Sequence, residues 1–194
     1  MSDRFSEPSD STPLTPDELE GLLPTWIATR ADLNAAEAEN IAVGAAWARR
    51  RQHDILTNDF VRTLHRRMFE DVWKWAGGYR HSERNIGVEP YRITVEVRQL
   101  LDDTKFWVEN ETYEPIEIAV RLHHRLVSVH PFPDGNGRHS RLMADLLAAR
   151  LGYASLSWGR ANLIEAGEDR KRYISALHAA DDNDIEPLID FAQS

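Results

Sequence analysis

One stretch of twelve residues, 130–141, concentrates the groups that could act on a phosphate ester. It holds an imidazole at its first position, a carboxylate, two glycines around an asparagine, and two arginines three positions apart. Glycines let backbone N–H groups converge on one point, and the N-terminus of a following helix adds unpaired N–H groups with a partial positive charge. Arginines at this spacing share a helix face and offer guanidinium forks to phosphate oxygens. The stretch predicts a polyphosphate site, with His130 and Asp134 available for chemistry.

Each part of this stretch has a plainer explanation when taken alone. A histidine before proline often only packs or caps a helix, and an aspartate before glycine is often a turn residue. Arg141 could pair with Asp145 one turn further on. The stretch is not a dinucleotide fingerprint, because it follows a predicted helix rather than a strand, and it has no Walker-type Gly-Lys-Ser/Thr. The combination within twelve residues nevertheless favours a functional loop over an ordinary turn.

Helices are predicted on both sides of the loop and through most of the chain. Pro115 favours a helix start, so a helix is expected over 116–129, and a second, Leu-rich helix runs from 142 until Gly152 stops it. Further helices are predicted at 33–51 with Asp32 as cap, 57–75, 95–109, 169–180 and 184–192. Glycine, proline and extended-favouring residues between 79 and 94 predict a β-hairpin or extended flap. The expected organisation is a flexible arm (1–16), an N-terminal helical extension (17–56) and a core domain (57–194).

Composition narrows the class of protein. The 194 residues are 42% hydrophobic and 28% charged, which suits a globular domain. A formal charge of −9 argues against general affinity for nucleic acid or anionic membranes. The absence of cysteine excludes disulfides and thiolate metal sites. No apolar run is long enough to cross a bilayer, and the polar, acidic N-terminus is unlike a signal peptide, so we expect a cytoplasmic protein.

The loop resembles the signature of the Fic family, His-Pro-Phe-x-Asp/Glu-Gly-Asn-Gly-Arg-x-x-Arg, at every defined position. Trp75-Ala76-Gly77 and Tyr79-Arg80 resemble the segment that introduces the flap of that family. Residues 20–24 and 29–41 are similar to a bacterial subgroup called mobile mystery protein B. The resemblance implies a mainly α Fic fold, a helical bundle with a small β-hairpin flap next to the active-site loop.

It also implies a protein adenylyltransferase, which moves AMP from ATP to a Tyr, Thr or Ser hydroxyl of a target protein and releases pyrophosphate. His130, with a pKa near neutrality, would be the general base, and Asp134 would hold Mg²⁺. Pro131 and Phe132 would be structural. The expected phosphate ligands are the backbone of the loop glycines, a donor from the asparagine side chain, and both arginines: Gly135, Asn136, Gly137, Arg138 and Arg141.

The flap would bind the target protein by adding a strand, through residues Arg84, Asn85, Ile86, Gly87 and Val88. Other readings remain open. They are phosphotransfer, phosphocholine transfer, removal of AMP, or a regulator that binds nucleotide without catalysis. Asp134 and both glycines favour AMP transfer over phosphotransfer, and an intact His130 argues against a purely binding role.

The sequence also bears on regulation. Many family members carry an inhibitory helix, Ser/Thr-x-x-x-Glu-Gly/Asn, whose glutamate pairs with the second arginine of the signature. Glu20, Glu39 and Glu109 are each followed by Gly or Asn, but none has a hydroxyl residue four positions earlier. Two hypotheses follow: a degenerate inhibitory helix in which Glu39 restrains Arg141, or a separate antitoxin-like inhibitor protein.

Overall fold

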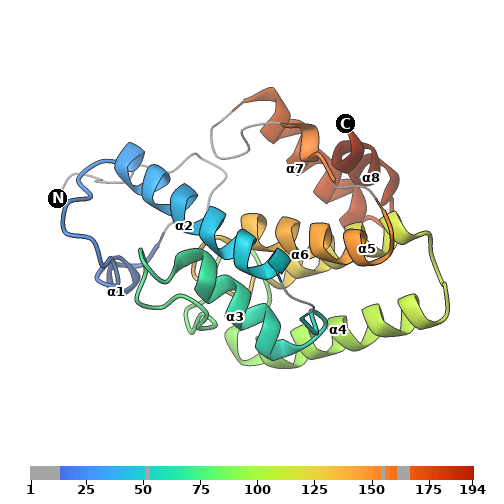
Figure 1. Ribbon diagram of the computed structural model, residues 1–194, viewed down its shortest axis with the longest axis horizontal. Coiled ribbons are helices and arrows are strands. Elements are labelled where there is room, and N and C mark those ends of the chain that lie inside the picture. Colours follow the sequence, from blue (N-terminus) through green and yellow to red (C-terminus); the bar gives the residue numbers. More distant parts are fainter. Residues whose placement is uncertain (1–13, 51–52, 154–155, 161–166) are drawn as a thin grey trace.

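The computed structural model describes residues 14–50, 53–153, 156–160 and 167–194 (Figure 1). These residues form α-helices and two short 3₁₀ helices, with one isolated β-bridge between Leu22 and Trp73. The elements in chain order are α1 Pro16–Leu19, α2 Arg30–Arg50, α3 Asn58–Phe69, η1 Pro90–Arg92, α4 Ile93–Glu109, α5 Pro115–Val129, α6 Asn136–Arg150, η2 Trp158–Arg160, α7 Glu168–Asp181 and α8 Glu186–Gln193.

Helices α5 and α6 pack along each other at the centre of the bundle and are joined by residues 130–135, the first half of the candidate functional loop. In Figure 1, α3 and α4 lie on one side of this pair and α7 and α8 on the other, while α2 runs along α3. The loop therefore lies at one end of a rigid helix pair, which fixes the positions of its side chains.

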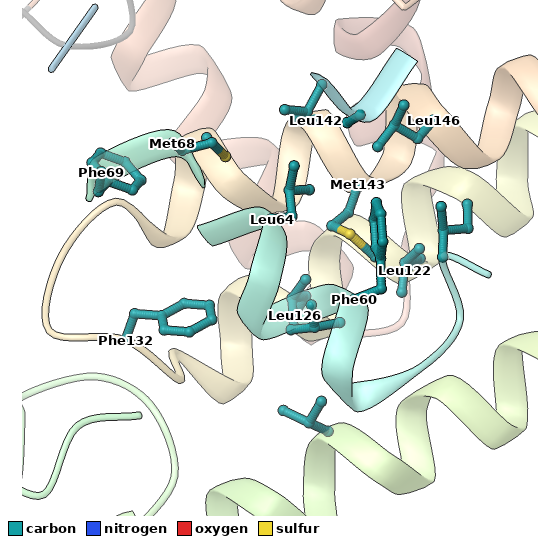
Figure 2. Packing of buried hydrophobic residues seen from close by; sticks show 14 of the residues in the cluster. Phe60, Leu64, Met68, Phe69, Leu122, Leu126, Phe132, Leu142, Met143 and Leu146 are labelled. Atoms are coloured by element: carbon teal, nitrogen blue, oxygen red, sulfur yellow. The ribbon is translucent and has the colours of Figure 1, made fainter. Parts of the chain in front are cut away.

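Two apolar clusters hold the bundle together. The larger cluster contains residues from each of the helices α2, α3, α4, α5 and α6. Figure 2 shows Leu64, Met68, Leu126 and Met143 in it, with the ring of Phe132 pointing in from the loop. The smaller cluster packs α7 and α8 against the small residues of α5 and α6. Burying one large apolar side chain contributes about 1.5–3 kcal/mol, so these clusters supply the main stabilisation of the fold.

The helical class is as predicted, but several boundaries differ. Helix α2 begins at Arg30 because the Thr29 hydroxyl accepts from Asp32 N–H while the Asp32 carboxylate accepts from Thr29 N–H, so Asp32 is in the first turn rather than at the cap. Helix α3 ends at Phe69, although apolar spacing continues to Trp75. Helix α8 begins at Glu186, after Ile185 rather than Asp184.

The predicted β-hairpin flap is wrong, because residues 79–89 form an irregular loop that leads into η1 and α4. A buried arginine takes the place of strand pairing. The Arg80 guanidinium donates to the backbone oxygens of Ser82, Val88 and His130, so the loop closes around one side chain. Val88 N–H also donates to Val129 O at 3.3 Å, which attaches the loop to the end of α5.

The predicted flexible arm lies almost wholly outside the described residues, and the division into extension and core stays a prediction. Within the described part, Leu23 N–H donates to Val72 O and Lys74 N–H to Gly21 O, so the segment before α2 is attached to the turn after α3. None of the helices in the described ranges is long and apolar enough to span a membrane.

Candidate active site

His130 is the C-cap of α5 and adopts the left-handed backbone conformation, with φ 51° and ψ 60°. A non-glycine residue there costs about 1–2 kcal/mol, so neighbouring contacts must stabilise it. Arg80 supplies them: its Nε donates to His130 O at 2.6 Å and its backbone N–H donates to Pro131 O at 2.9 Å. Arg80 is 2% exposed, so these contacts are shielded from water.

The loop before η1 also presses against His130. Gly87 has φ 94°, and a Cβ atom on it would lie 2.6 Å from His130 Cβ and 2.7 Å from Arg80 Nη2. Only glycine therefore permits this close approach. Its neighbour Ile86 is 46% exposed and lies on the solvent side of the loop.

The pKa of His130 is lowered to about 4, chiefly by burial and then by the charge of Arg80, while the charge of Asp134 opposes the shift. The pKa near neutrality that was expected from the sequence is wrong, because the tertiary structure buries the ring. The imidazole is consequently neutral at pH 7. A neutral imidazole is the form that can accept a proton.

Helix α6 starts at Asn136, after Gly135 with φ 75°. The N–H groups of Asn136 and Gly137, in its first turn, have no intrahelical acceptors and provide an anion site in the loop. The Asn136 side chain is hydrogen-bonded within the loop, and its expected donation to a phosphate stays a prediction. Its Nδ2 donates to Phe132 O at 2.8 Å and its Oδ1 accepts from Phe132 N–H at 2.9 Å. Asn136 therefore braces the loop from within.

His65, on α3, contacts the loop through Phe132 and Asp134. Its ring stacks on Phe132 with centroids 3.7 Å apart, and both side chains are fully buried. Burial holds the pKa of His65 well below its usual value, so the ring is neutral. Its Nδ1 accepts from Gly77 N–H at 3.0 Å, which leaves Nε2–H to donate to Asp134 O at 3.0 Å. The backbone of Asp134 is thus fixed, while its carboxylate remains partly exposed.

Arg138 is held by two carboxylates. Its Nη1 lies 2.5 Å from Glu37 Oε2 and its Nη2 lies 3.2 Å from Asp134 Oδ2. Glu37, on α2, is 1% exposed, and its other oxygen accepts from Trp73 Nε1 at 2.6 Å. The glutamate that meets the loop is therefore Glu37.

The hypothesis that Glu39 restrains Arg141 is wrong for this structure. Glu39 is exposed on the outer side of α2. Arg141 instead lies over the ring of Tyr173 at 5.5 Å, and its Nη1 is 3.5 Å from the position of a Cβ on Gly137. Both arginines of the signature therefore lie at the N-terminal end of α6. Asp145, the plainer partner considered for Arg141, accepts from Trp158 Nε1 at 2.8 Å.

The structure thus brings His130, Asp134, the N-terminus of α6 and both arginines to one end of the α5–α6 pair. Residues 84–88 border this end. Val88 already uses both its N–H and its oxygen in hydrogen bonds, and target binding by this segment stays a prediction. Arg84 is buried against Glu18 of α1. The sequence analysis missed Glu37, His65 and Arg80 as site residues. Only Arg80 had a signal, its place in the Tyr79-Arg80 pair.

Comparison with known proteins identifies a family domain in the chain. Residues 55–148, which include the whole loop, match the Fic/DOC family. The chain carries a Fic/DOC domain. Protein adenylyltransferase fic-1 of Caenorhabditis elegans is 31% identical over 147 residues, 72% of this chain and 27% of that protein. The chain therefore spans about a quarter of the length of this curated relative.

Solved Fic structures share the fold. Fic-1 of C. elegans (residues 134–508) has a TM-score of 0.60 at 28% identity, covering 90% of this chain and 55% of that one. The N-terminal Fic domain of a Bep effector protein from Bartonella quintana, with bound ADP, has a TM-score of 0.67 at 20% identity, covering 87% and 86%. The predicted mainly α Fic fold is confirmed. The mobile mystery protein B subgroup stays a prediction.

Proposed function

We propose that this protein is an adenylyltransferase that moves AMP from ATP to a hydroxyl side chain of a target protein. One observation carries the proposal: a neutral, buried imidazole lies beside a helix N-terminus that is flanked by two arginines. Support also comes from the C. elegans relative, which is named a protein adenylyltransferase, and from the B. quintana Fic domain with bound ADP.

In the proposed reaction His130 accepts the proton of the target hydroxyl while the hydroxyl oxygen attacks the α-phosphorus of ATP. The new bond is the phosphoester between that oxygen and the α-phosphorus, and the bond to the β-phosphate oxygen breaks to release pyrophosphate. The N–H groups of Asn136 and Gly137 stabilise the negative charge on phosphate oxygens. Arg138 and Arg141 bind the outer phosphates, since both lie at this end of α6.

Asp134 would hold Mg²⁺, which supplies charge neutralisation on the phosphates when bound. The residues fit such an ion. Mg²⁺ in nucleotide sites is held by one or two carboxylates together with the phosphates, so a single aspartate is enough on the protein side. A site made by protein side chains alone is not expected, since the described residues contain no group of three or more His, Cys, Asp or Glu that could hold a metal. The Asp134 side chain is 32% exposed, and His65 fixes its backbone.

We further propose that Glu37 restrains the enzyme in the state seen here. Arg138 must turn its guanidinium from Glu37 toward the outer phosphates, or the buried carboxylate of Glu37 will lie beside them as a like charge. This assigns to Glu37 and Arg138 the restraint that the sequence analysis gave to Glu39 and Arg141. A separate inhibitor protein stays an untested alternative.

The proposal is tested with ATP labelled at either the α- or the γ-phosphate, together with Mg²⁺ and cell lysate. We expect labelled protein from the α-label alone, and no labelled protein with His130→Ala. Labelling from the γ-phosphate would assign the site to phosphotransfer. ATP binding without transfer would assign the protein to the class of nucleotide-binding regulators.

A further inference from the structure

A polar hollow is lined in part by Gly77, whose N–H donates to His65 Nδ1, while the other ring nitrogen of His65 contacts Asp134 O. It has a volume of about 590 Å³ and is formed between α3 and the turn at residues 74–78. Its charged lining consists of Arg62, Arg66 and Lys74 with a single acid, Asp59. Three cations to one anion is the reverse of the balance in the whole chain, which carries a formal charge of −9. We call this feature the basic hollow.

The walls of the basic hollow are held in place before any ligand arrives. Gly77 has φ 78°, and a Cβ atom on it would lie 2.8 Å from both Arg62 O and Arg66 Cβ, so the turn lies directly on α3. Arg62 Nε donates to Gly77 O at 3.0 Å, and its guanidinium lies 5.5 Å from the centre of the Tyr79 ring. A ligand would meet an arginine that is already oriented, which reduces the entropy lost on binding.

The other two cations are little neutralised by the protein. Arg66 has an acidic neighbour, Glu70, but their closest atoms are 3.8 Å apart and the arginine side chain is 52% exposed. The exposed Lys74 side chain has no acidic side chain within ion-pair distance among the described residues. Three cations with one acid leave a net positive charge in the hollow, which attracts a negatively charged partner.

The geometry distinguishes between anionic partners. A phosphate group is favoured by converging backbone N–H groups, but Gly77 N–H donates to His65 Nδ1 and Gly78 N–H to Trp75 O. Nucleic acid is disfavoured because many phosphates must be neutralised, whereas this site offers three cations on an acidic protein. Cations separated on two walls suit carboxylates that are spaced along a peptide.

We propose that the basic hollow binds an acidic segment of a partner protein. The carboxylates of that segment pair with Arg62, Arg66 and Lys74, and its backbone occupies the space between α3 and the turn. This goes beyond the proposed function, because no step of AMP transfer uses these three side chains. The hollow and the transfer site are therefore separable by mutation.

The test follows binding of an octaglutamate peptide by NMR at low salt. We expect saturable shifts of the Gly77 and Gly78 amides and the Trp75 indole, and weaker binding as salt screens the charges. Lys74→Glu should weaken binding at least about fivefold, since one exposed ion pair is worth up to about fivefold and reversal adds repulsion. Lys105→Glu, at an exposed lysine on α4 with a distant acidic neighbour, is the matched control and should bind as the parent does.

Arg66→Glu provides a second variant, because the Arg66 side chain makes no hydrogen bond among the described residues and only a 3.8 Å contact with Glu70. The proposal is overturned if octaglutamate causes no saturable shifts at these residues, or if Lys74→Glu and Lys105→Glu bind it equally. It is also overturned if single-stranded oligonucleotide or inorganic phosphate binds there more tightly, or if sedimentation shows that the hollow is buried between two copies of the chain. Parent-like ATP binding by both variants would show that the transfer site is intact.

Discussion

Replacing Glu37 by glutamine should raise ATP affinity and lower stability at the same time. The glutamine keeps the size of the side chain and an oxygen to accept from Trp73 Nε1, but it removes the charge that holds Arg138 Nη1 at 2.5 Å. Arg138 then becomes available to the outer phosphates without first leaving a buried carboxylate. A charge-assisted hydrogen bond contributes about 1.5–3 kcal/mol, so ATP should bind about 10- to 100-fold more tightly.

The same change should destabilise the folded protein. Removing one member of a buried ion pair costs about 3–5 kcal/mol when the remaining charge is left without compensation. Arg138 keeps Asp134 as a neighbour at 3.2 Å and is itself 17% exposed, so we expect a smaller loss, about 1–2 kcal/mol. Calorimetric titration with ATP measures the first effect and urea unfolding measures the second.

Glu39→Gln is the matched control for Glu37→Gln. It makes the same chemical change two residues further along α2, on the exposed side, and should alter neither ATP affinity nor stability. The reasoning is refuted if Glu37→Gln leaves ATP affinity unchanged, or if Glu39→Gln raises it equally.

Three further predictions concern His130 and the buried histidines. Because the pKa of His130 is about 4, kcat/KM for AMP transfer at pH 6.0 should nearly equal that at pH 7.5. A histidine with an unshifted pKa would instead give a fall of about fourfold. Circular dichroism at both pH values checks that the protein is equally folded. Gly87→Ala should reduce kcat more than about tenfold with little change in ATP affinity, because its Cβ would push His130 from its position; unchanged kcat would contradict the close approach. Urea unfolding should show a loss of stability of about 4–5 kcal/mol between pH 7.5 and 5.5, because four histidines with lowered pKa values take up protons on unfolding. Among the described residues, Asp145, with a pKa raised to about 6, opposes the trend. Each of these histidines contributes about 1.4 kcal/mol over that interval. Stability independent of pH between 7.5 and 5.5 would show that their rings are not buried. The four histidines are His65, His123, His130 and His139.

The sequence predicted the functional loop because all of its parts are contiguous. Helix periodicity, Pro115 and Gly152 also marked the two helices that carry it, since these signals are local. The partners of the loop were not predictable in the same way. Glu37 lies 101 residues before Arg138, and neither its neighbours nor its spacing separate it from Glu39.

Two errors have a common physical cause, the burial of polar groups by tertiary structure. The β-hairpin was predicted from turn residues, but the Arg80 side chain satisfies the backbone oxygens that a second strand would otherwise have paired. The pKa of His130 was expected near neutrality, but its ring is enclosed by the loop that contains Gly87. Sequence patterns report faces and turns, and they do not report which polar groups become buried against one another.

The most direct test of the central claim compares ATP binding with AMP transfer in His130→Ala. The account predicts that this variant binds ATP with nearly the parent affinity, because the α6 N-terminus and both arginines remain. It also predicts that transfer of label from the α-phosphate to protein falls by at least about 100-fold, as expected for loss of a general base. Transfer at the parent rate by a folded His130→Ala protein would contradict the account.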